Sequence, residues 1–221
     1  MKVEEEQGLK KVLDGLRKTP TASLSDALDQ MGVRGFISHE FRPLIQGHKI
    51  VGPALTIKHQ LCNRVASFIP ALEAIDEAKQ GTVLVIAGDA DLRDVGLFGG
   101  LMATASKARG LAGAVLDGGV RDTREIREMG FQVFSRSVIP TTSIGRTELV
   151  GVNVPLICGG VTVQPGDIIV GDDDGVVVIP KDRVGEALER ALRFDEVEVV
   201  EAEELRKGAS FVETIKKHAR V

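Results

Sequence analysis

The sequence predicts an α/β domain with parallel strands, followed by an antiparallel β meander and a C-terminal helix. In the middle third of the 221 residues, short apolar runs alternate with amphipathic helical segments, which is typical of parallel strands joined by helical crossovers. Beyond Leu149 the pattern changes to short β runs separated by Pro-Gly and Asp-Gly turns. From Lys181 onward, apolar residues return at helical spacing.

Length and composition favour one domain that spans residues 1–221. Hydrophobic residues make up 43% of the chain, enough to bury a substantial core. No window approaches the roughly 20 apolar residues of a membrane-spanning helix, and no apolar leader follows a basic segment at the start. Cys62 and Cys158 lack the C-x-x-C spacing of a redox pair or zinc site. We therefore expect reduced thiols and a soluble, cytoplasmic protein without a membrane partner.

Charge and aromatic content argue against a nucleic-acid partner. The formal net charge is −4, so the chain lacks the broad positive field that binds a phosphate backbone. It has no Trp or Tyr, and its eight Phe leave little material for stacking bases. The composition therefore excludes the usual nucleic-acid readers as a function class.

The N-terminal part of the chain predicts two helices and then a long strand. Both helices lie within Gln7–Gly32. Thr21 or Ser23 is expected to cap the second helix, and Gly32 to end it. Ile50–Leu61 alternates enough between apolar and polar residues to form a strand.

A helix, a buried strand and a loop are expected next. Arg64–Lys79 carries apolar residues at helical spacing, and Pro70 is expected to kink or restart that helix. Thr82–Ala87 is a continuous apolar run, which favours a strand covered on both faces. The segment Gly88–Gly100 then predicts a glycine-rich loop.

The alternation of helix and strand continues through the middle of the chain. Helices are expected over Leu101–Arg109 and Thr123–Met129, and strands over Ala114–Leu116 and Gln132–Ser135. Asp117–Asp122 is expected to be a loop. Sites in parallel sheets form where the carboxyl ends of strands meet helix N-termini. The two loops, Gly88–Gly100 and Asp117–Asp122, are therefore the places where a site is expected.

The last third predicts β structure and then a helix. The β runs are VGVNVPLICGGVTV, DIIVGD and GVVVIP. The acidic run Asp172–Asp174 resembles a metal cluster, but it precedes Gly175 between β runs, which favours a hairpin turn. The helix that begins near Lys181 runs into the acidic stretch Asp195–Glu204.

Two segments in which glycines immediately precede a helix contain the main candidates for functional residues. Exposed N–H groups at a helix start, aided by the helix dipole, bind anions, so Gly99–Met102 is a candidate receptor for a carboxylate. Arg121 can hold a carboxylate through two parallel hydrogen bonds, and Asp122 offers oxygen ligands that suit Mg²⁺ or Mn²⁺. The combination predicts a site for a divalent metal cation and a small anionic acid.

Several of these residues also have a structural interpretation. Asp122-Thr-Arg-Glu125 has the spacing of a capping box, and spacing alone favours that role for Asp122. An arginine such as Arg121, taken alone, is more often solvated than catalytic. Arg93 and Asp94 could reach a distal carboxylate, but a surface pair is favoured. The four histidines lack metal-ligand spacing, and structural or surface roles are expected for His39, His48, His59 and His218.

The segments Gly99-Gly100-Leu101-Met102 and Arg121-Asp122 resemble the mark of the RraA-like and 4-hydroxy-4-methyl-2-oxoglutarate/4-carboxy-4-hydroxy-2-oxoadipate aldolase family. In that family a glycine-led segment is followed at a fixed distance by Arg-Asp. The resemblance extends over most of the chain through SDALD, GPALTIK, KARGLAGAVLDGGVRD and PGDIIVGDDDGVVVIP.

The resemblance implies a layered α/β/α domain of the swivelling β/β/α type, assembled as a homotrimer or hexamer. It implies a metal-dependent aldolase that cleaves 4-hydroxy-4-methyl-2-oxoglutarate-type oxo acids to pyruvate, with oxaloacetate decarboxylation as a side activity. The substrate's pyruvate-like end would be held by the amides of Gly99, Gly100, Leu101 and Met102 and by Arg121, and Asp122 would bind Mg²⁺ or Mn²⁺. A carboxylate from the C-terminal helix of a neighbouring subunit would lie near the waters on the metal, and among Glu196, Glu198 and Glu201 we favour Glu198.

Other functions remain open beside this one. RraA-like members of the family regulate a ribonuclease by protein contact, which is the non-catalytic alternative. Methyl transfer is disfavoured, because the glycine-rich first β–α loop of such enzymes is not clearly present. Glu198 lies in an acidic run that also fits a solvated helix face. Some members carry an acidic residue where this chain has Gly100, so the group that handles the proton stays open.

Overall fold

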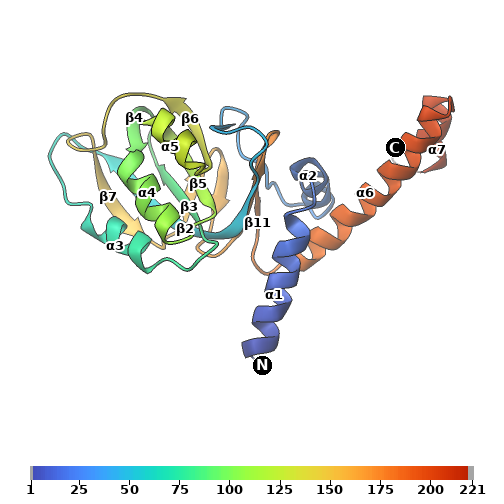
Figure 1. Ribbon diagram of the computed structural model, residues 1–221, viewed down its shortest axis with the longest axis horizontal. Coiled ribbons are helices and arrows are strands. Elements are labelled where there is room, and N and C mark those ends of the chain that lie inside the picture. Colours follow the sequence, from blue (N-terminus) through green and yellow to red (C-terminus); the bar gives the residue numbers. More distant parts are fainter. Residues whose placement is uncertain (1, 219–221) are drawn as a thin grey trace.

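A mixed β-sheet forms the centre of the fold in the computed structural model, which describes residues 2–218 (Figure 1). The strands are β1 (Arg42–Pro43), β2 (Ile50–Leu61), β3 (Val83–Gly88), β4 (Leu92–Phe98), β5 (Gly113–Val120), β6 (Val133–Val138), β7 (Thr147–Val152), β8 (Leu156–Cys158), β9 (Val161–Val163), β10 (Ile168–Asp172) and β11 (Gly175–Ile179). The helices are α1 (Lys2–Leu16), α2 (Thr21–Gln30), α3 (Ile69–Glu77), α4 (Gly100–Ala108), α5 (Thr123–Met129), α6 (Val184–Arg206) and α7 (Phe211–Lys217). The strand order is β1-β6-β5-β3-β2-β10-β11, with β4 paired to β5 and β7 paired to β2.

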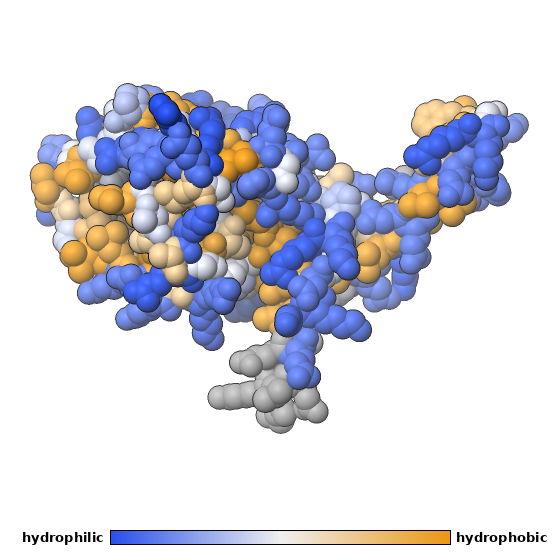
Figure 2. Space-filling model, in the orientation of Figure 1, coloured by the Kyte–Doolittle hydropathy of each residue, from blue (hydrophilic) through white to orange (hydrophobic). Residues whose placement is uncertain are grey.

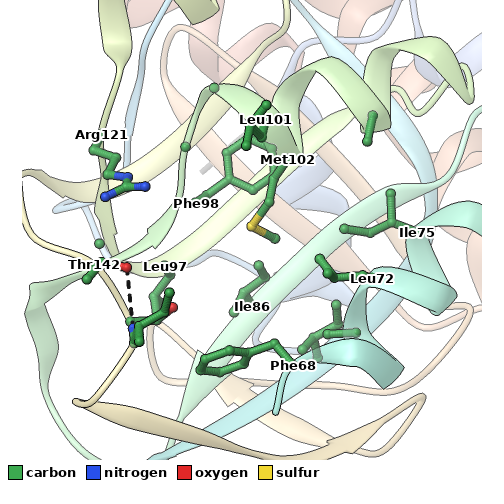
Figure 3. A pocket seen from close by; sticks show the side chains of 18 of the residues that line it. Phe68, Leu72, Ile75, Ile86, Leu97, Phe98, Leu101, Met102, Arg121 and Thr142 are labelled. Atoms are coloured by element: carbon green, nitrogen blue, oxygen red, sulfur yellow. Dashed lines mark hydrogen bonds between the residues drawn. The ribbon is translucent and has the colours of Figure 1, made fainter. Parts of the chain in front are cut away.

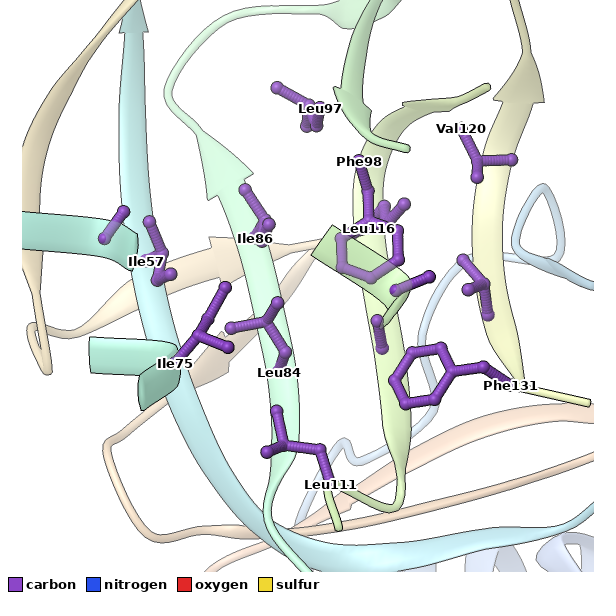
Figure 4. Close-up of a cluster of buried hydrophobic side chains, with 14 of the residues drawn as sticks. Ile57, Ile75, Leu84, Ile86, Leu97, Phe98, Leu111, Leu116, Val120 and Phe131 are labelled. Atoms are coloured by element: carbon purple, nitrogen blue, oxygen red, sulfur yellow. The ribbon is translucent and has the colours of Figure 1, made fainter. Parts of the chain in front are cut away.

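Four central strands, β2, β3, β5 and β6, run parallel, as the alternating sequence pattern predicted. Successive side chains of a strand point to opposite faces, so Leu84 and Ile86 of β3 enter one core and Val83 and Val85 enter the other. The first core is the cluster drawn in Figure 4, where Leu84 and Ile86 pack with Ile75 from α3. The second core includes residues of β8 and β9. Because both faces are covered, β3 is apolar throughout.

The predicted antiparallel meander is only partly confirmed. β10 and β11 form an antiparallel hairpin, and β8 and β9 form another. However, β10 also pairs with Ile50–Pro53 of β2, and β7 pairs with Ile57–Leu61 of the same strand. With 12 residues, β2 is about twice the usual strand length, which leaves room for two partners along one edge. Strands β7, β10 and β11 therefore extend the parallel sheet, whereas β8 and β9 form a separate two-stranded sheet.

A helical part made of α1, α2 and α6 packs on the hairpin β10–β11. Its core joins Leu16 of α1, Leu24 and Leu28 of α2 and Ala187 of α6 to Val177 of β11. α6 has 23 residues and is about 35 Å long, so it extends with α7 well beyond the sheet (Figure 1). The predicted C-terminal helix is confirmed.

Two strand boundaries differ from the prediction in ways that bear on the site. The expected loop Gly88–Gly100 contains β4, whose pairing with β5 is interrupted by register shifts. Because β4 contains the polar pair Arg93-Asp94, it lacks the continuous apolar run that would predict a buried strand. The expected loop Asp117–Asp122 is mostly strand, because β5 continues to Val120. Only Arg121 and Asp122 therefore connect β5 to α5.

Helix boundaries also differ at three places. α1 begins at Lys2, before the expected Gln7. α3 begins only at Ile69, because Pro70 fits the first turn of a helix but not its interior. Neither expected cap applies to α2, which starts after Pro20, and the Thr21 hydroxyl instead donates to Asp172 at 2.5 Å.

Exposed apolar residues gather around α3 and also on α6 and α7, where Val199, Phe211 and Val212 are exposed. Figure 2 shows apolar side chains gathered on the left of the sheet-bearing part, where exposed apolar residues include Leu61, Val65, Ile69 and Leu72. Among residues 2–218, no helix is both long and apolar enough to cross a bilayer. Both cysteines are free thiols, and burial raises the pKa of the Cys158 thiol.

Candidate active site

A cavity lies where β4 and β5 end beside the N-termini of α4 and α5. Its volume is about 500 Å³, within the range of roughly 300–1,000 Å³ that is typical of small-ligand pockets. Gly99 directly follows β4 and Arg121 directly follows β5, so the parallel pairing of these strands brings the two glycine-led segments to one wall (Figure 3). A cavity therefore lies at the carboxyl ends of the strands, where the sequence predicted a site.

Asp122 joins the two helices at this wall. Its backbone has φ 56° and ψ 35°, a left-handed conformation that Asp tolerates better than most residues. The side chain makes no capping hydrogen bond to α5, so the capping-box interpretation is wrong. Instead its Oδ2 accepts the N–H of Gly100 at 3.0 Å. The side chain is 45% exposed, so a ligand in the cavity can reach it.

Arg121 lies beside this carboxylate. Its backbone N–H donates to the carbonyl of Phe98 at 3.0 Å, which ties the end of β5 to the end of β4. Its Nε is 3.6 Å from Oδ2 of Asp122, and the side chain is 43% exposed. In Figure 3 the guanidinium extends along the cavity towards Thr142. A planar cation in this position can bind an incoming carboxylate.

Gly99–Met102 forms the start of α4, as the sequence predicted. Gly99 is extended, and its carbonyl accepts the N–H of Ala103 at 3.0 Å. The first N–H groups of a helix have no partner within it, so those of Leu101 and Met102 are available to an anion while that of Gly100 binds Asp122. A Cβ on Gly99 would lie 2.8 Å from Asp122 Oδ2, so only glycine allows this close approach.

Glu125 is a residue near the site to which the sequence assigned only a capping role. A Cβ on Gly100 would lie 2.4 Å from Oε2 of Glu125. The carboxylate of Glu125 therefore occupies the space into which a side chain at position 100 would extend. The sequence feature that could have indicated this position of Glu125 is its spacing of three residues from Asp122, because residues three apart lie on one side of a helix.

The rest of the cavity wall is largely apolar, apart from Thr142 and Ser143. Its side chains come from β2, β3, β4, α3 with the preceding Phe68, α4 and the segment 142–144, and Figure 3 shows several of them converging on the space beyond Arg121. They include Ile57, Phe68, Leu72, Ile75, Ile86, Leu97, Phe98 and Met102. The cavity thus has one charged end and one apolar end.

His59 is buried in this wall. Its ring stacks on Phe68 at 5.4 Å between centroids, and Nδ1 lies 3.1 Å from the Thr147 hydroxyl. Burial lowers the pKa of His59 to about 4, so the imidazole is neutral near pH 7. The expected structural role fits these contacts, but no pattern in the sequence indicates that His59 borders the cavity.

Three other candidates lie outside the cavity. Glu198 is on α6, in a separate hollow with Asp26 and Asp29 of α2. Within one chain it is therefore not brought to Arg121 and Asp122. Arg93 pairs with Asp91 at 2.6 Å and with Glu40 at 3.3 Å, so its surface role is confirmed, but its partners differ from the expected Asp94.

The acidic run Asp172–Asp174 is a turn between β10 and β11, as predicted. Asp172 accepts hydrogen bonds from the Thr21 N–H and hydroxyl at 2.9 and 2.5 Å, and Lys49 Nζ lies 3.7 Å away. Asp173 accepts the N–H of Gly47 at 2.8 Å. These carboxylates hold α2 and the turn before β2 in place.

The carboxylates at the cavity fit a cation that is bound mainly by water and ligand. Within residues 2–218, no three His, Cys, Asp or Glu side chains are grouped so that they could hold a metal ion. Mg²⁺ usually keeps several waters and needs only one or two carboxylates, and Mn²⁺ also prefers oxygen ligands. Asp122 on the cavity wall supplies one such carboxylate, whereas Glu125 lies against Gly100 and is not among the residues that line the cavity.

Comparison with known proteins identifies the family. The model of the RraA-like family, described as Aldolase/RraA, matches residues 21–178. The chain belongs to the RraA-like family. A relative from Halalkalibacterium halodurans, named "Putative 4-hydroxy-4-methyl-2-oxoglutarate aldolase", is 38% identical over 175 residues, which cover 79% of each chain.

Solved RraA-like structures share the fold. An uncharacterized protein from Pseudomonas syringae pv. tomato has a TM-score of 0.82 and 32% identity, over 93% of this chain and 96% of that one. RraAS2 of Streptomyces coelicolor, described as an unusual member of the RNase ES inhibitor RraA family, has a TM-score of 0.76 and 28% identity, over 90% of this chain and 96% of that one. The RraA-like α/β fold with C-terminal helices is thus confirmed.

Proposed function

We propose that this RraA-like protein is a divalent-metal-dependent lyase that cleaves 4-hydroxy-2-oxo acids and releases pyruvate, with oxaloacetate decarboxylation as a side activity. One observation carries the proposal: Arg121, Asp122 and the free amides of α4 meet at one end of a cavity of small-ligand size. The aldolase name of the relative with 38% identity supports it.

The charged end of the cavity suits the 2-oxo acid head of such a substrate. The amides of Leu101 and Met102, with the helix dipole, and the guanidinium of Arg121 bind the carboxylate. Asp122 would hold Mg²⁺ or Mn²⁺ on the cavity wall. When bound, the cation supplies a positive charge that stabilises the negative charge developing on the oxo group.

Bond cleavage also needs a base for the 4-hydroxyl proton. As the proton leaves, the C3–C4 bond breaks, C4 becomes a carbonyl, and C3 takes up a proton to give pyruvate. Two carboxylates are candidates for the base: Glu125, beside Gly100, and Glu198 from a neighbouring copy in a trimer or hexamer. If Glu125 acts, Glu125→Gln lowers kcat with little change in KM, whereas Glu198→Gln lowers activity if assembly completes the site.

The test is pyruvate release, coupled to lactate dehydrogenase, from 4-hydroxy-4-methyl-2-oxoglutarate and from oxaloacetate, each with Mg²⁺, Mn²⁺ or EDTA. We expect turnover that EDTA abolishes. Arg121→Ala removes charge-assisted hydrogen bonds worth on the order of 1.5–3 kcal/mol, which is about ten- to 150-fold in kcat/KM. Wild-type turnover by a folded Arg121→Ala protein would contradict the proposed role of the site.

Regulation of a ribonuclease by protein contact is a second candidate, favoured by the similarity to RraAS2. The test is RNA cleavage by a purified RNase E-type enzyme with and without this protein. Inhibition that survives in Arg121→Ala, together with an absence of lyase turnover, would favour this function over catalysis.

A further inference from the structure

We propose that the part of the substrate beyond the 2-oxo acid head is an uncharged, apolar group. The inference rests on the proposed function for its chemistry, and it names the substrate class. The substrates are 4-hydroxy-2-oxo monocarboxylic acids with an alkyl group at C4, and the products are pyruvate and an aliphatic aldehyde or ketone. The hydroxyl proton leaves C4, the C3–C4 bond breaks and C3 is protonated, so no other reactant is needed.

The first argument is the position of the apolar wall. The head group is held at Arg121 and the start of α4, so the remainder of the substrate extends into the space beyond them. That space is bounded by well-packed side chains: Ile57, Ile75, Ile86, Leu97 and Phe98 are each at most 3% exposed. Rigid apolar walls of this kind favour an alkyl group, because it leaves water without losing hydrogen bonds.

The second argument is charge. Besides Arg121 and Asp122, the ionisable residues that line the cavity are His59 and Asp76. His59 is neutral near pH 7 because burial lowers its pKa to about 4. Asp76 carries the same sign as a carboxylate and is paired with Arg109 at 3.0 Å. Among the described residues that line the cavity, a second carboxylate in the apolar end would thus find no cation to pair with, which is unfavourable to the extent that it leaves water.

The experiment compares two substrates of matched shape. One is 4-hydroxy-4-methyl-2-oxoglutarate, and the other carries an isopropyl group in place of its distal carboxylate. We expect kcat/KM for the isopropyl compound to be at least tenfold higher, and to rise roughly fourfold per methylene in a series with longer straight alkyl groups. A preference for the diacid would overturn the inference and would indicate a cation supplied by a neighbouring copy.

A binding measurement distinguishes a failure of this inference from a failure of the proposed function. The affinities of 2-oxohexanoate and 2-oxoglutarate, measured by calorimetry with Mg²⁺, do not depend on turnover. Tighter binding of 2-oxohexanoate supports the apolar end even if no substrate is cleaved, in which case only the lyase proposal fails. Tighter binding of 2-oxoglutarate overturns the inference even if cleavage occurs.

A matched pair of variants on α3 tests the location. Leu72 borders the cavity and is partly exposed, so Leu72→Lys places a cation at the apolar end without disturbing the core. We expect it to shift the preference at least tenfold towards the diacid. Ile69 lies one turn earlier, is 56% exposed and does not border the cavity, so Ile69→Lys should keep the wild-type preference. Equal preferences in the two variants would refute the proposed location.

Discussion

Two acidic regions of this protein look alike in sequence and differ in how their carboxylates are used. Asp172 is the last residue of the buried strand β10, and Asp122 lies two residues after the last residue of the buried strand β5. Asp172 binds Thr21 twice and lies near Lys49, and its side chain is 21% exposed. Asp122 accepts one hydrogen bond, from Gly100, and is 45% exposed on a cavity wall. An acidic residue is thus a functional candidate when it faces a cavity and its carboxylate can still accept bonds beyond those it makes within the protein.

The largest expected effect is on the activity of Asp122→Asn. The amide oxygen can still accept the N–H of Gly100, so the fold should be retained, but the charge proposed to hold the cation is lost. We expect metal-dependent pyruvate release to fall more than about 100-fold, since a bound cation contributes several kcal/mol. The free energy of unfolding, from urea titration, should change by less than about 1 kcal/mol. Retained activity would place the cation elsewhere.

The second prediction concerns the effect of His59 on the pH dependence of stability. This side chain of the cavity wall is hydrogen-bonded to Thr147. Its pKa is about 4 when folded and 6.5 ordinarily, so the unfolded chain binds more protons between these values. Stability is therefore full above pH 6.5 and falls as the pH drops towards 4, by up to about 3 kcal/mol. Urea titrations at several pH values measure this slope. His59→Gln should flatten it, and an unchanged slope would mean that other groups cause it.

The third prediction concerns Asp172, where we expect substitution to lower stability and to leave activity nearly unchanged. Asp172→Asn removes the charge opposite Lys49, whose own pKa is lowered by burial although Asp172 raises it. We expect a loss of stability of about 2 kcal/mol, because hydrogen bonds to charged groups contribute roughly 1.5–3 kcal/mol. Its kcat/KM should stay within about twofold of the wild-type value. A large loss of activity in the folded variant would contradict the distinction between the two regions.

The smallest effect tests the packing of Glu125 on Gly100. In Gly100→Ala the new Cβ would lie 2.4 Å from Oε2 of Glu125, and this exposed side chain must move. We expect a loss of about 1 kcal/mol of stability. The double variant Gly100→Ala/Glu125→Ala should recover most of it, so a double-mutant cycle gives a coupling energy between the two positions. Additive effects would show that the two positions do not interact.

The local pattern of the sequence was sufficient for much of the framework. Ile50–Leu61 and Thr123–Met129 have the predicted boundaries, and Gly32, Gly110 and Gly130 follow α2, α4 and α5 with positive φ. These features depend on neighbours along the chain: side-chain alternation, helical spacing and glycine at helix ends. β4 was missed for the same reason, because its polar residues break the apolar run.

The sequence alone determined that the protein is α/β and that Gly99–Met102 and Arg121-Asp122 are candidates for an anion and metal site. Only the tertiary structure decided that Asp122 binds Gly100 instead of capping α5, that Glu125 lies against Gly100, and that His59 joins an apolar wall beside them. The physical reason is distance along the chain. Spacing reveals contacts within one helix or strand, whereas Gly100 and Asp122 meet because β4 and β5 pair in parallel and end at the same edge of the sheet.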